Sequence, residues 1–352
     1  MPVSGSDETA SEKVHERVQR AHWPARTHVV ILDGTLSTLD PGRSTNAGRI
    51  FKLLMDLPPA HRPNIYYEEG IQWHEWRNCT DVLTGAGINR QIRRAYGFLA
   101  SRYHPGDRIF LLGYSRGAFA VRSLAGVIDR VGLLKPNRAT ERMIRQLYRH
   151  YEYDPHGRQA RLFARKFCHP NVEIEMVGVF DTVKALGWRL PILAGLTDKA
   201  HAFHSTHLGH HIRHGFHALA MNETREAFAP VLWTCPEGWT GHVEQVWFRG
   251  NHGDIGGQLS GFDAARPLSN IPLVWMLGKA EDCGLPLPDG WRARFPCDAE
   301  APSSGGWRGW AKLFALRRRR QVGHDPSERL HPTAKPHAVR WAESLPLAQP
   351  GM

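Results

Sequence analysis

Short runs of apolar residues alternate along this chain with longer segments in which apolar residues recur every three or four positions. The short runs are rich in β-branched and aromatic side chains, which is the pattern of buried strands. They fall at residues 27–32, 64–67, 107–112, 172–180 and 243–248. The longer segments predict helices at 47–56, 88–103, 116–131, 139–152 and 217–228. Strands that alternate with helices in this way predict an α/β fold, with a mostly parallel sheet covered by helices on both faces.

This pattern fades toward both ends of the chain. Residues 1–24 are polar and read as a lead-in to a main domain that we expect to span 25–285. Proline, glycine and arginine are frequent over the C-terminal extension, 286–352, and we expect the tail from residue 321 to be loosely attached because it has little periodicity. Within the main domain, 184–216 is rich in histidine, glycine and leucine, and is interpreted as a lid or as a core-packing insertion.

The composition is that of a folded, basic protein. The 352 residues are 41% hydrophobic, and the formal net charge is +11. Such a charge favours anionic partners, among them an anionic membrane surface that the protein would contact peripherally. Nucleic acid is not expected as a partner, because no recognition motif is present and the run Arg317–Arg320 is typical of a solvated tail.

The cysteines and the N-terminus bear on the compartment. Five scattered cysteines without a C-x-x-C pair predict free thiols in a reducing environment. The N-terminus has no apolar segment of the kind found in secretory signals, and no stretch approaches the roughly 18 apolar residues of a transmembrane helix. We therefore expect a cytoplasmic protein, whose export would need a machine that does not read a cleaved N-terminal signal.

The segment Gly113-Tyr-Ser-Arg-Gly117 lies between the strand predicted at 107–112 and the helix predicted at 116–131. Strand, G-x-S-x-G and helix together form the context of a nucleophile elbow, in which a strained turn exposes a serine hydroxyl. The reaction class that this predicts is attack by an activated serine on an acyl carbonyl.

Polar turns at three predicted strand ends supply a catalytic triad. In parallel sheets, active sites form beyond the carboxyl ends of the strands, and Ser115, Asp181 and His252 all follow strands. Ser115 would attack, His252 would take and return its proton, and Asp181 would orient and stabilise the imidazolium. Asp254, two residues after His252, is the alternative acid, although it could instead fix the loop.

An oxyanion hole needs backbone N–H groups aimed at the developing negative charge. We expect one from Arg116, which follows the nucleophile, and another from the turn Asp33-Gly-Thr35 after the first strand. Gly34 would permit close approach of the backbone, and Thr35 would donate. Asp33 would be an unfavourable neighbour for an oxyanion, so we expect it to accept hydrogen bonds from the loop.

The same turn resembles the D-x-D-G-T start of haloacid-dehalogenase-like phosphatases. In that family the first aspartate is the nucleophile, and Ile31 occupies its position here. A covalent mechanism cannot run without its nucleophile, so this interpretation is rejected.

Seven histidines cluster between residues 201 and 217: His201, His204, His207, His210, His211, His214 and His217. Their composition is that of a metal-binding tract, but no acidic or cysteine ligands surround them. We expect neither a metal nor a cofactor.

Together these motifs resemble an uncharacterised α/β-hydrolase-like domain family that includes the catalytic domains of type VI secretion phospholipase effectors. The matching segments are 32–35, 44–46, 66–67, 85–87, 103–109, 113–118, 178–183, 217–220 and 246–257. The resemblance spans roughly residues 27–275. The resemblance implies that the domain expected over 25–285 is an α/β-hydrolase-like catalytic domain, with Ser115, Asp181 and His252 as a metal-independent triad. The effector members cleave phospholipid acyl esters. Asn251-His-Gly-Asp254 departs from the family's Val-His-Ser-Asp but keeps His252 and Asp254.

We therefore predict a serine esterase of the phospholipase A type, with an ester or phospholipid substrate. A hydrolase of a soluble ester, thioester or peptide would use the same triad, and a non-catalytic binding module on a hydrolase fold is the third hypothesis. An amphipathic lid with Trp188, Leu190, Ile192, Leu193 and Leu196 could meet lipid. The resemblance also implies that the protein could be exported by a contact-dependent secretion machine. The sequence does not indicate an oligomeric state.

Overall fold

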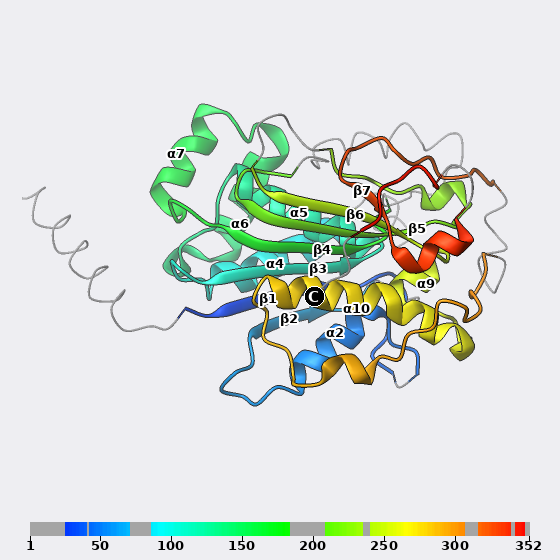
Figure 1. Ribbon diagram of the computed structural model, residues 1–352. Coiled ribbons are helices and arrows are strands. Elements are labelled where there is room, and N and C mark those ends of the chain that lie inside the picture. The colour runs from blue at the N-terminus through cyan, green and yellow to red at the C-terminus, as the bar shows by residue number, and fades with distance from the viewer. Residues whose placement is uncertain are drawn as a thin grey trace, which may run out of the picture.

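The computed structural model describes residues 25–40, 42–70, 86–183, 208–234, 240–306, 316–338 and 342–348. A seven-stranded sheet with all strands parallel runs through this part of the chain, in the order β2-β1-β3-β4-β5-β6-β7 (Figure 1). The strands are β1 (Thr27–Leu32), β2 (Asn64–Glu68), β3 (Arg108–Tyr114), β4 (Ile174–Phe180), β5 (Ile212–Ala220), β6 (His242–Phe248) and β7 (Glu328–Leu330).

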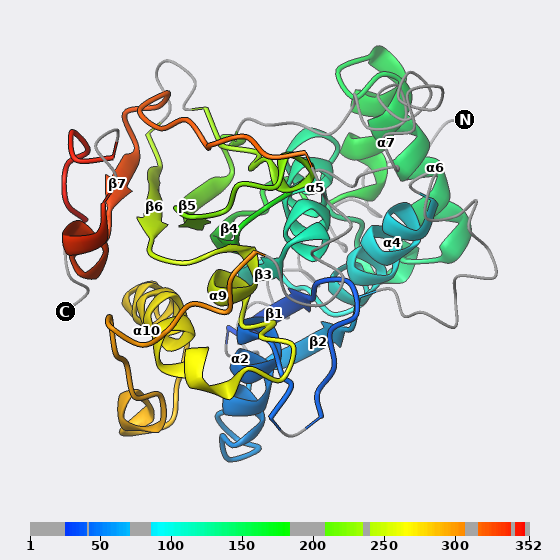
Figure 2. The ribbon, with the colours of Figure 1, turned by 90° about the vertical axis from the view of Figure 1, so that its right-hand side faces the viewer.

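Helices cover both faces of the sheet. The α-helices are α2 (Asn46–Met55), α4 (Ala86–Ala100), α5 (Arg116–Arg130), α6 (Glu141–Tyr153), α7 (Arg158–Phe167), α9 (His252–Gly256) and α10 (Arg266–Asp282). Helices α4, α5 and α6 pack on one face, whereas α2 and α10 pack on the other (Figures 1 and 2). This arrangement confirms the predicted α/β-hydrolase-like fold.

Alternate residues of each central strand feed the two cores. In β1, Val30 and Leu32 belong to the core under α4 and α5, whereas Val29 and Ile31 belong to the core under α2 and α10. Successive side chains of a strand point to opposite faces, and both faces are covered here, so β1 reads as one continuous apolar run.

The prediction of a helix at 217–228 is wrong. Residues 212–220 form β5 in the centre of the sheet, and only Glu226–Phe228 turn into a short 3-10 helix. Phe216, Ala218 and Ala220 pack in the α2–α10 core, while Leu219 packs on the opposite side in a small third cluster. A strand buried on both faces lacks the alternation that separates it from a buried helix.

The expectation of a loosely attached tail is also wrong. Strand β7 pairs with β6 through Gln245, Val246 and Trp247. Leu330, Ala334 and Ala342 pack with Leu219, Met221 and Trp247 in the third cluster. The C-terminal segment therefore completes one edge of the sheet.

Most of the predicted lid falls outside the described residues, as do its five named apolar side chains. Of its last residues, 208–211 lead into β5 and 212–216 form the first part of that strand, which is a core element and not a lid. Among the histidines of the tract, His201, His204 and His207 are likewise outside the described part. His217 is buried in β5, where burial, together with the positive charge of Arg122, lowers its pKa to about 3.

Candidate active site

The turn between β3 and α5 has the geometry of a nucleophile elbow. Ser115 has φ 57° and ψ −119°, a backbone region that residues other than glycine rarely occupy. A Cβ on Gly113 would lie 2.8 Å from the backbone of Ala118, and one on Gly117 would lie 2.1 Å from the Leu32 carbonyl oxygen. Both glycines are therefore needed for α5 to begin so close to β1 and β3.

The structure brings the three predicted triad residues together at the carboxyl ends of the strands. His252 Nε2 lies 2.9 Å from Ser115 Oγ, and His252 Nδ1 lies 2.6 Å from Asp181 Oδ2. The three residues are almost entirely buried, with exposed fractions of 7% for Ser115, 4% for His252 and 0% for Asp181. In this arrangement Nδ1–H donates to the carboxylate, which leaves Nε2 free to accept the serine proton.

His252 is the first residue of α9, where Asn251 caps the helix. Burial lowers the pKa of His252, and the hydrogen bond and negative charge of Asp181 oppose that effect. Its ring packs against the rings of Tyr114 and Phe228, whose centroids lie 4.9 Å and 4.7 Å away. A neutral imidazole held in one orientation is the form that a general base requires.

Asp254, the alternative acid, fixes the loop. Its Oδ2 accepts from the Asn251 N–H at 2.9 Å and from the Ser303 hydroxyl at 2.5 Å, while its Oδ1 accepts from the Ser304 N–H at 2.9 Å. These bonds hold the turn that presents His252 and direct the Asp254 carboxylate to backbone and hydroxyl donors. The geometry favours Asp181 as the partner of the imidazole.

Asp181 carries a second charged partner that the sequence did not reveal. Arg320 Nη1 lies 2.6 Å from Asp181 Oδ1, and Arg320 Nη2 lies 2.9 Å from Oδ2. Burial alone would raise the pKa of Asp181, but the charge and hydrogen bonds of Arg320, together with His252, hold it well below the ordinary range. The assignment of Arg317–Arg320 to a solvated tail is therefore wrong for Arg320, since in that run it alone is buried.

Another buried ion pair supports the histidine loop and was also missed. Glu223 Oε2 accepts from the His252 N–H at 3.1 Å and from Arg225 Nη2 at 2.6 Å. Burial would raise the pKa of Glu223, but Arg225 lowers it to about 2. The Arg225 guanidinium lies 4.0 Å from the centroid of the Phe228 ring, so the pair also positions the ring that packs on His252.

The turn after β1 lies beside Ser115. A Cβ on Gly34 would lie 3.4 Å from Ser115 Cβ and 2.6 Å from the Tyr114 ring, so Gly34 permits the close approach. The Gly34 N–H donates to Asp33 Oδ1 at 2.7 Å. Within the described part of the chain, the Thr35 N–H has no hydrogen-bond partner, and Arg116 stands at the first position of α5, where N–H groups are also unpaired. The assignment of the Arg116 and Thr35 N–H groups to an oxyanion hole stays a prediction.

Asp33 accepts three hydrogen bonds. Besides the Gly34 N–H, the Thr45 hydroxyl donates to Oδ2 at 2.6 Å and the Tyr67 hydroxyl donates to it at 2.8 Å. Burial nevertheless raises the pKa of Asp33 to about 6. The carboxyl thus ties the turn to α2 and β2, which agrees with the expected structural role.

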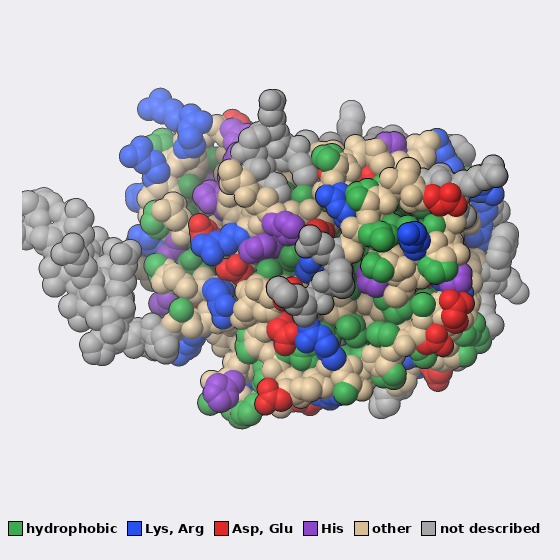
Figure 3. Space-filling view, viewed as in Figure 1, with side chains coloured by type: hydrophobic (Ala, Val, Ile, Leu, Met, Phe, Trp, Pro, Cys, Tyr) green, Lys and Arg blue, Asp and Glu red, His purple; other side chains and the backbone are tan. Residues whose placement is uncertain are grey.

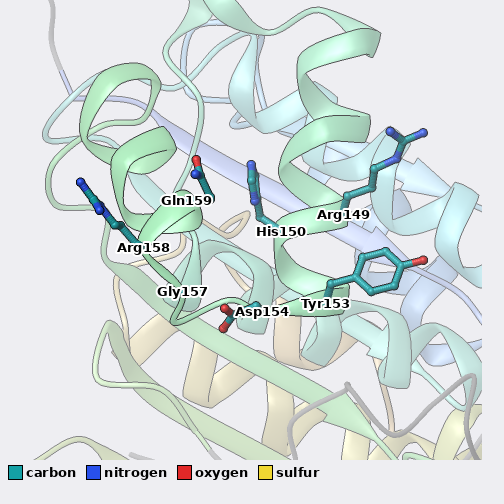
Figure 4. Close-up of a pocket in the computed structure, with 7 residues that line it drawn as sticks. All are labelled: Arg149, His150, Tyr153, Asp154, Gly157, Arg158 and Gln159. Atoms are coloured by element: carbon teal, nitrogen blue, oxygen red, sulfur yellow. The ribbon is translucent and has the colours of Figure 1, made fainter.

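A surface pocket of about 300 Å³ lies elsewhere, between α6 and α7 (Figure 4). Its walls include Arg149, Tyr153 and Arg158, and α7 lies near the amino ends of the strands, opposite α9 (Figure 1). It is therefore remote from Ser115. Among the described residues, no three His, Cys, Asp or Glu side chains are grouped as metal ligands, and no helix is long and apolar enough to cross a membrane.

Comparison with known proteins identifies a family that matches this chain. A family model described as the catalytic domain of Tle1-like type VI secretion phospholipase effectors matches residues 26–279. Uncharacterized protein YEL023C of Saccharomyces cerevisiae is 29% identical over 232 residues, which are 58% of this chain and 32% of the yeast protein.

Two solved structures are also similar. An uncharacterized protein from Pseudomonas aeruginosa matches with 16% identity and a TM-score of 0.43, over 89% of this chain and 54% of that one. The Tle1 effector bound to the VgrG spike matches with 17% identity and a TM-score of 0.30, over 66% of this chain and 52% of that one. The chain thus spans about a third of the yeast relative and about half of each of these structures.

Proposed function

Because the chain belongs to the family of Tle1-like type VI secretion phospholipase effector catalytic domains, and is therefore a hydrolase of the lipase and esterase class, we propose that it cleaves carboxylic esters with a Ser115–His252–Asp181 triad. The proposed substrate is a phospholipid, cleaved at an acyl ester as in phospholipase A. No metal takes part in the proposed reaction.

In the proposed mechanism, His252 Nε2 takes the Ser115 proton while Oγ attacks the ester carbonyl. Asp181 stabilises the imidazolium that forms. The N–H groups of Arg116 and Thr35 stabilise the oxyanion of the tetrahedral intermediate. His252 then returns the proton to the leaving alcohol, and a water molecule activated by the same histidine hydrolyses the acyl-enzyme.

The observation that carries the proposal is the continuous hydrogen-bonded relay from Ser115 through His252 to Asp181, with distances of 2.9 Å and 2.6 Å. It begins at a serine held in a strained conformation. Strain of this kind costs about 1–3 kcal/mol and persists where the surrounding structure enforces it, as at catalytic residues. A non-catalytic module would have no use for this combination.

A soluble ester, thioester or peptide remains the alternative substrate, because the relay would act on any activated acyl group. Two observations favour lipid: the family description and the net charge of +11, which would attract the protein to an anionic bilayer. Peripheral contact with such a bilayer, and export by a contact-dependent secretion machine, are part of this proposal.

The test is release of fatty acid from vesicles of mixed zwitterionic and anionic phospholipids, with the wild-type chain compared with Ser115→Ala. We expect release of fatty acid and lysophospholipid, lost in Ser115→Ala. Ser123→Ala is the matched control, because Ser123 is a buried serine of α5 whose hydroxyl donates to the Phe119 carbonyl. Release that persists in Ser115→Ala would contradict the triad. Serine-dependent cleavage of soluble esters without release from vesicles would support the alternative substrate.

A further inference from the structure

The carboxylate proposed to orient His252 is held by a residue far along the chain. Arg320 is separated from Asp181 by 139 positions and lies beyond residue 279, where the family match ends. We infer that Arg320 is a positioning residue of the active site, which fixes the Asp181 carboxylate against His252 and keeps it charged. This inference rests on the proposed function.

The hydrogen bonds to the Asp181 carboxylate together hold it in one orientation. Oδ1 accepts from Arg320 Nη1 and from the Ala220 N–H at 3.0 Å, whereas Oδ2 accepts from Arg320 Nη2 and from His252 Nδ1. A two-point Arg–carboxylate contact fixes the plane of the carboxylate as well as its place. Rotation that would carry Oδ2 away from the imidazole is therefore blocked.

Arg320 is itself rigidly held. Its Nη1 donates to the Ala220 carbonyl at 2.8 Å, and its Nη2 donates to the Phe228 carbonyl at 2.6 Å. Only 3% of its side chain is exposed. The chain that follows is tied to the sheet edge by Glu328, which accepts from the N–H groups of Gly323, His324 and Asp325 and from the Trp247 indole.

Removing Arg320 has a definite electrostatic sign. Without that positive charge, the His252–Asp181 pair binds a proton more tightly, whichever member carries it. As the pH falls, the pair therefore loses its active form, neutral His252 beside ionised Asp181, at a higher pH than in the wild type. The other charged or titratable groups around the pair stay in place: Tyr114 from β3, His217 from β5, and Glu223 with Arg225 from the β5–β6 connection.

The experiment measures the second-order rate constant for labelling of Ser115 by a small neutral fluorophosphonate, as a function of pH. In this reaction the bond from Ser115 Oγ to phosphorus forms, the P–F bond breaks, fluoride leaves, and His252 takes the hydroxyl proton. The reagent needs the activated serine but no knowledge of the natural substrate. Mass spectrometry of the labelled peptide identifies the site.

We expect Arg320→Met to move the acid limb of the labelling profile upward by about one pH unit or more, in line with the effect of a neighbouring opposite charge. Arg320→Lys keeps the charge but not the two-point contact, so its acid limb should stay near that of the wild type while its rate constant falls at least about tenfold. Arg319→Met is the matched control, because Arg319 is an exposed arginine of the same run, and its profile should not change.

A role of Arg320 in holding the tail alone would reduce the labelled fraction without moving the acid limb. An unmoved limb in Arg320→Met therefore overturns the inference. If Arg320→Met does not fold, Arg320→Lys decides, and wild-type labelling by that variant overturns the positioning role. Absence of Ser115 labelling in the wild-type chain would be a different result, because it would reject the proposed triad itself.

Discussion

At the scale of single residues, the candidate site combines strain with buried charge. Ser115 has a positive φ in a region that glycine tolerates far better than residues with a Cβ. Relief of such strain is worth about 1–3 kcal/mol, partly offset by the larger entropy of glycine in the unfolded chain. We predict that Ser115→Gly unfolds with a free energy roughly 1 kcal/mol higher than Ser115→Ala, although both are inactive.

Chemical denaturation of the two variants checks this prediction, and Ser123 provides the control. Ser123 lies within α5, where alanine is more stable than glycine by about 1 kcal/mol. Ser123→Ala should therefore be more stable than Ser123→Gly, which is the reverse of the order predicted at Ser115. The same order at both positions would mean that the turn carries no strain.

Asp33 gives a prediction about pH. Its pKa is raised from 3.8 to about 6, so the folded protein binds this proton more tightly than the unfolded chain does. The stability due to Asp33 is therefore fully present below pH 4 and is lost as the pH rises toward 6. Relative to Asp33→Asn, which keeps no titrating group, the wild type should lose up to about 3 kcal/mol of unfolding free energy between pH 4 and pH 7.

Urea unfolding of both proteins at several pH values measures that difference. Asp282→Asn is the control, because Asp282 is an exposed carboxyl at the end of α10. The stability of this control should run parallel to that of the wild type. Parallel curves for Asp33→Asn as well would show that folding does not raise the pKa of Asp33.

At the scale of elements, the site depends on how closely α5 approaches β1. A Cβ at position 117 would lie 2.1 Å from the Leu32 carbonyl oxygen and 2.5 Å from that of Asp33, and both are backbone atoms that cannot turn away. We predict that Gly117→Ala lowers the free energy of unfolding by roughly 2–3 kcal/mol and reduces activity, because the Asp33–Thr35 turn must shift.

The control is the same substitution inside α4. A Cβ at position 97 would meet only the flexible end of Ile144, at 3.2 Å. Gly97→Ala should therefore be neutral or stabilising by up to about 1 kcal/mol, through helix propensity. Thermal unfolding of both variants decides the matter, and equal losses would contradict the steric argument.

Elements with a local pattern could be predicted from the sequence, whereas those that depend on distant partners could not. The strand predicted at 27–32 coincides with β1, and the helix predicted at 116–131 is α5 within one residue. The central strand β5 was predicted as a helix because its two buried faces hide its alternation. The three residues of β7 are too few for any period, and nothing near Arg320 in the sequence points to Asp181.

The same division applies to the candidate site. Ser115, Asp181 and His252 could be named because each follows an apolar strand in a distinctive polar turn. The supporting ion pairs, Arg320 with Asp181 and Arg225 with Glu223, were missed. Buried charges are recognisable only once their partners are in place, since in sequence they look like ordinary surface residues.

At the scale of the whole molecule, the position of the charge matters more than its sum. Lys and Arg side chains gather over α7, near the amino ends of the strands (Figure 3), whereas α9 and the turn at residues 33–35 lie at the carboxyl ends, which face the viewer in Figure 2. A bilayer that delivers substrate to Ser115 has to meet the carboxyl ends. The basic helix α7 then faces away from the lipid.

Two single substitutions, each of which removes one positive charge, test this orientation. Arg43 is exposed in the loop that follows the turn at the carboxyl end of β1, and Arg158 is exposed at the start of α7. A basic residue near an anionic bilayer contributes about 1 kcal/mol to binding. We predict that Arg43→Gln slows hydrolysis of anionic vesicles about fivefold at low salt, that the difference shrinks at high salt, and that Arg158→Gln has no effect. Both variants should cleave a soluble ester at the wild-type rate, so a loss confined to Arg158→Gln would mean that the protein meets lipid through its opposite end.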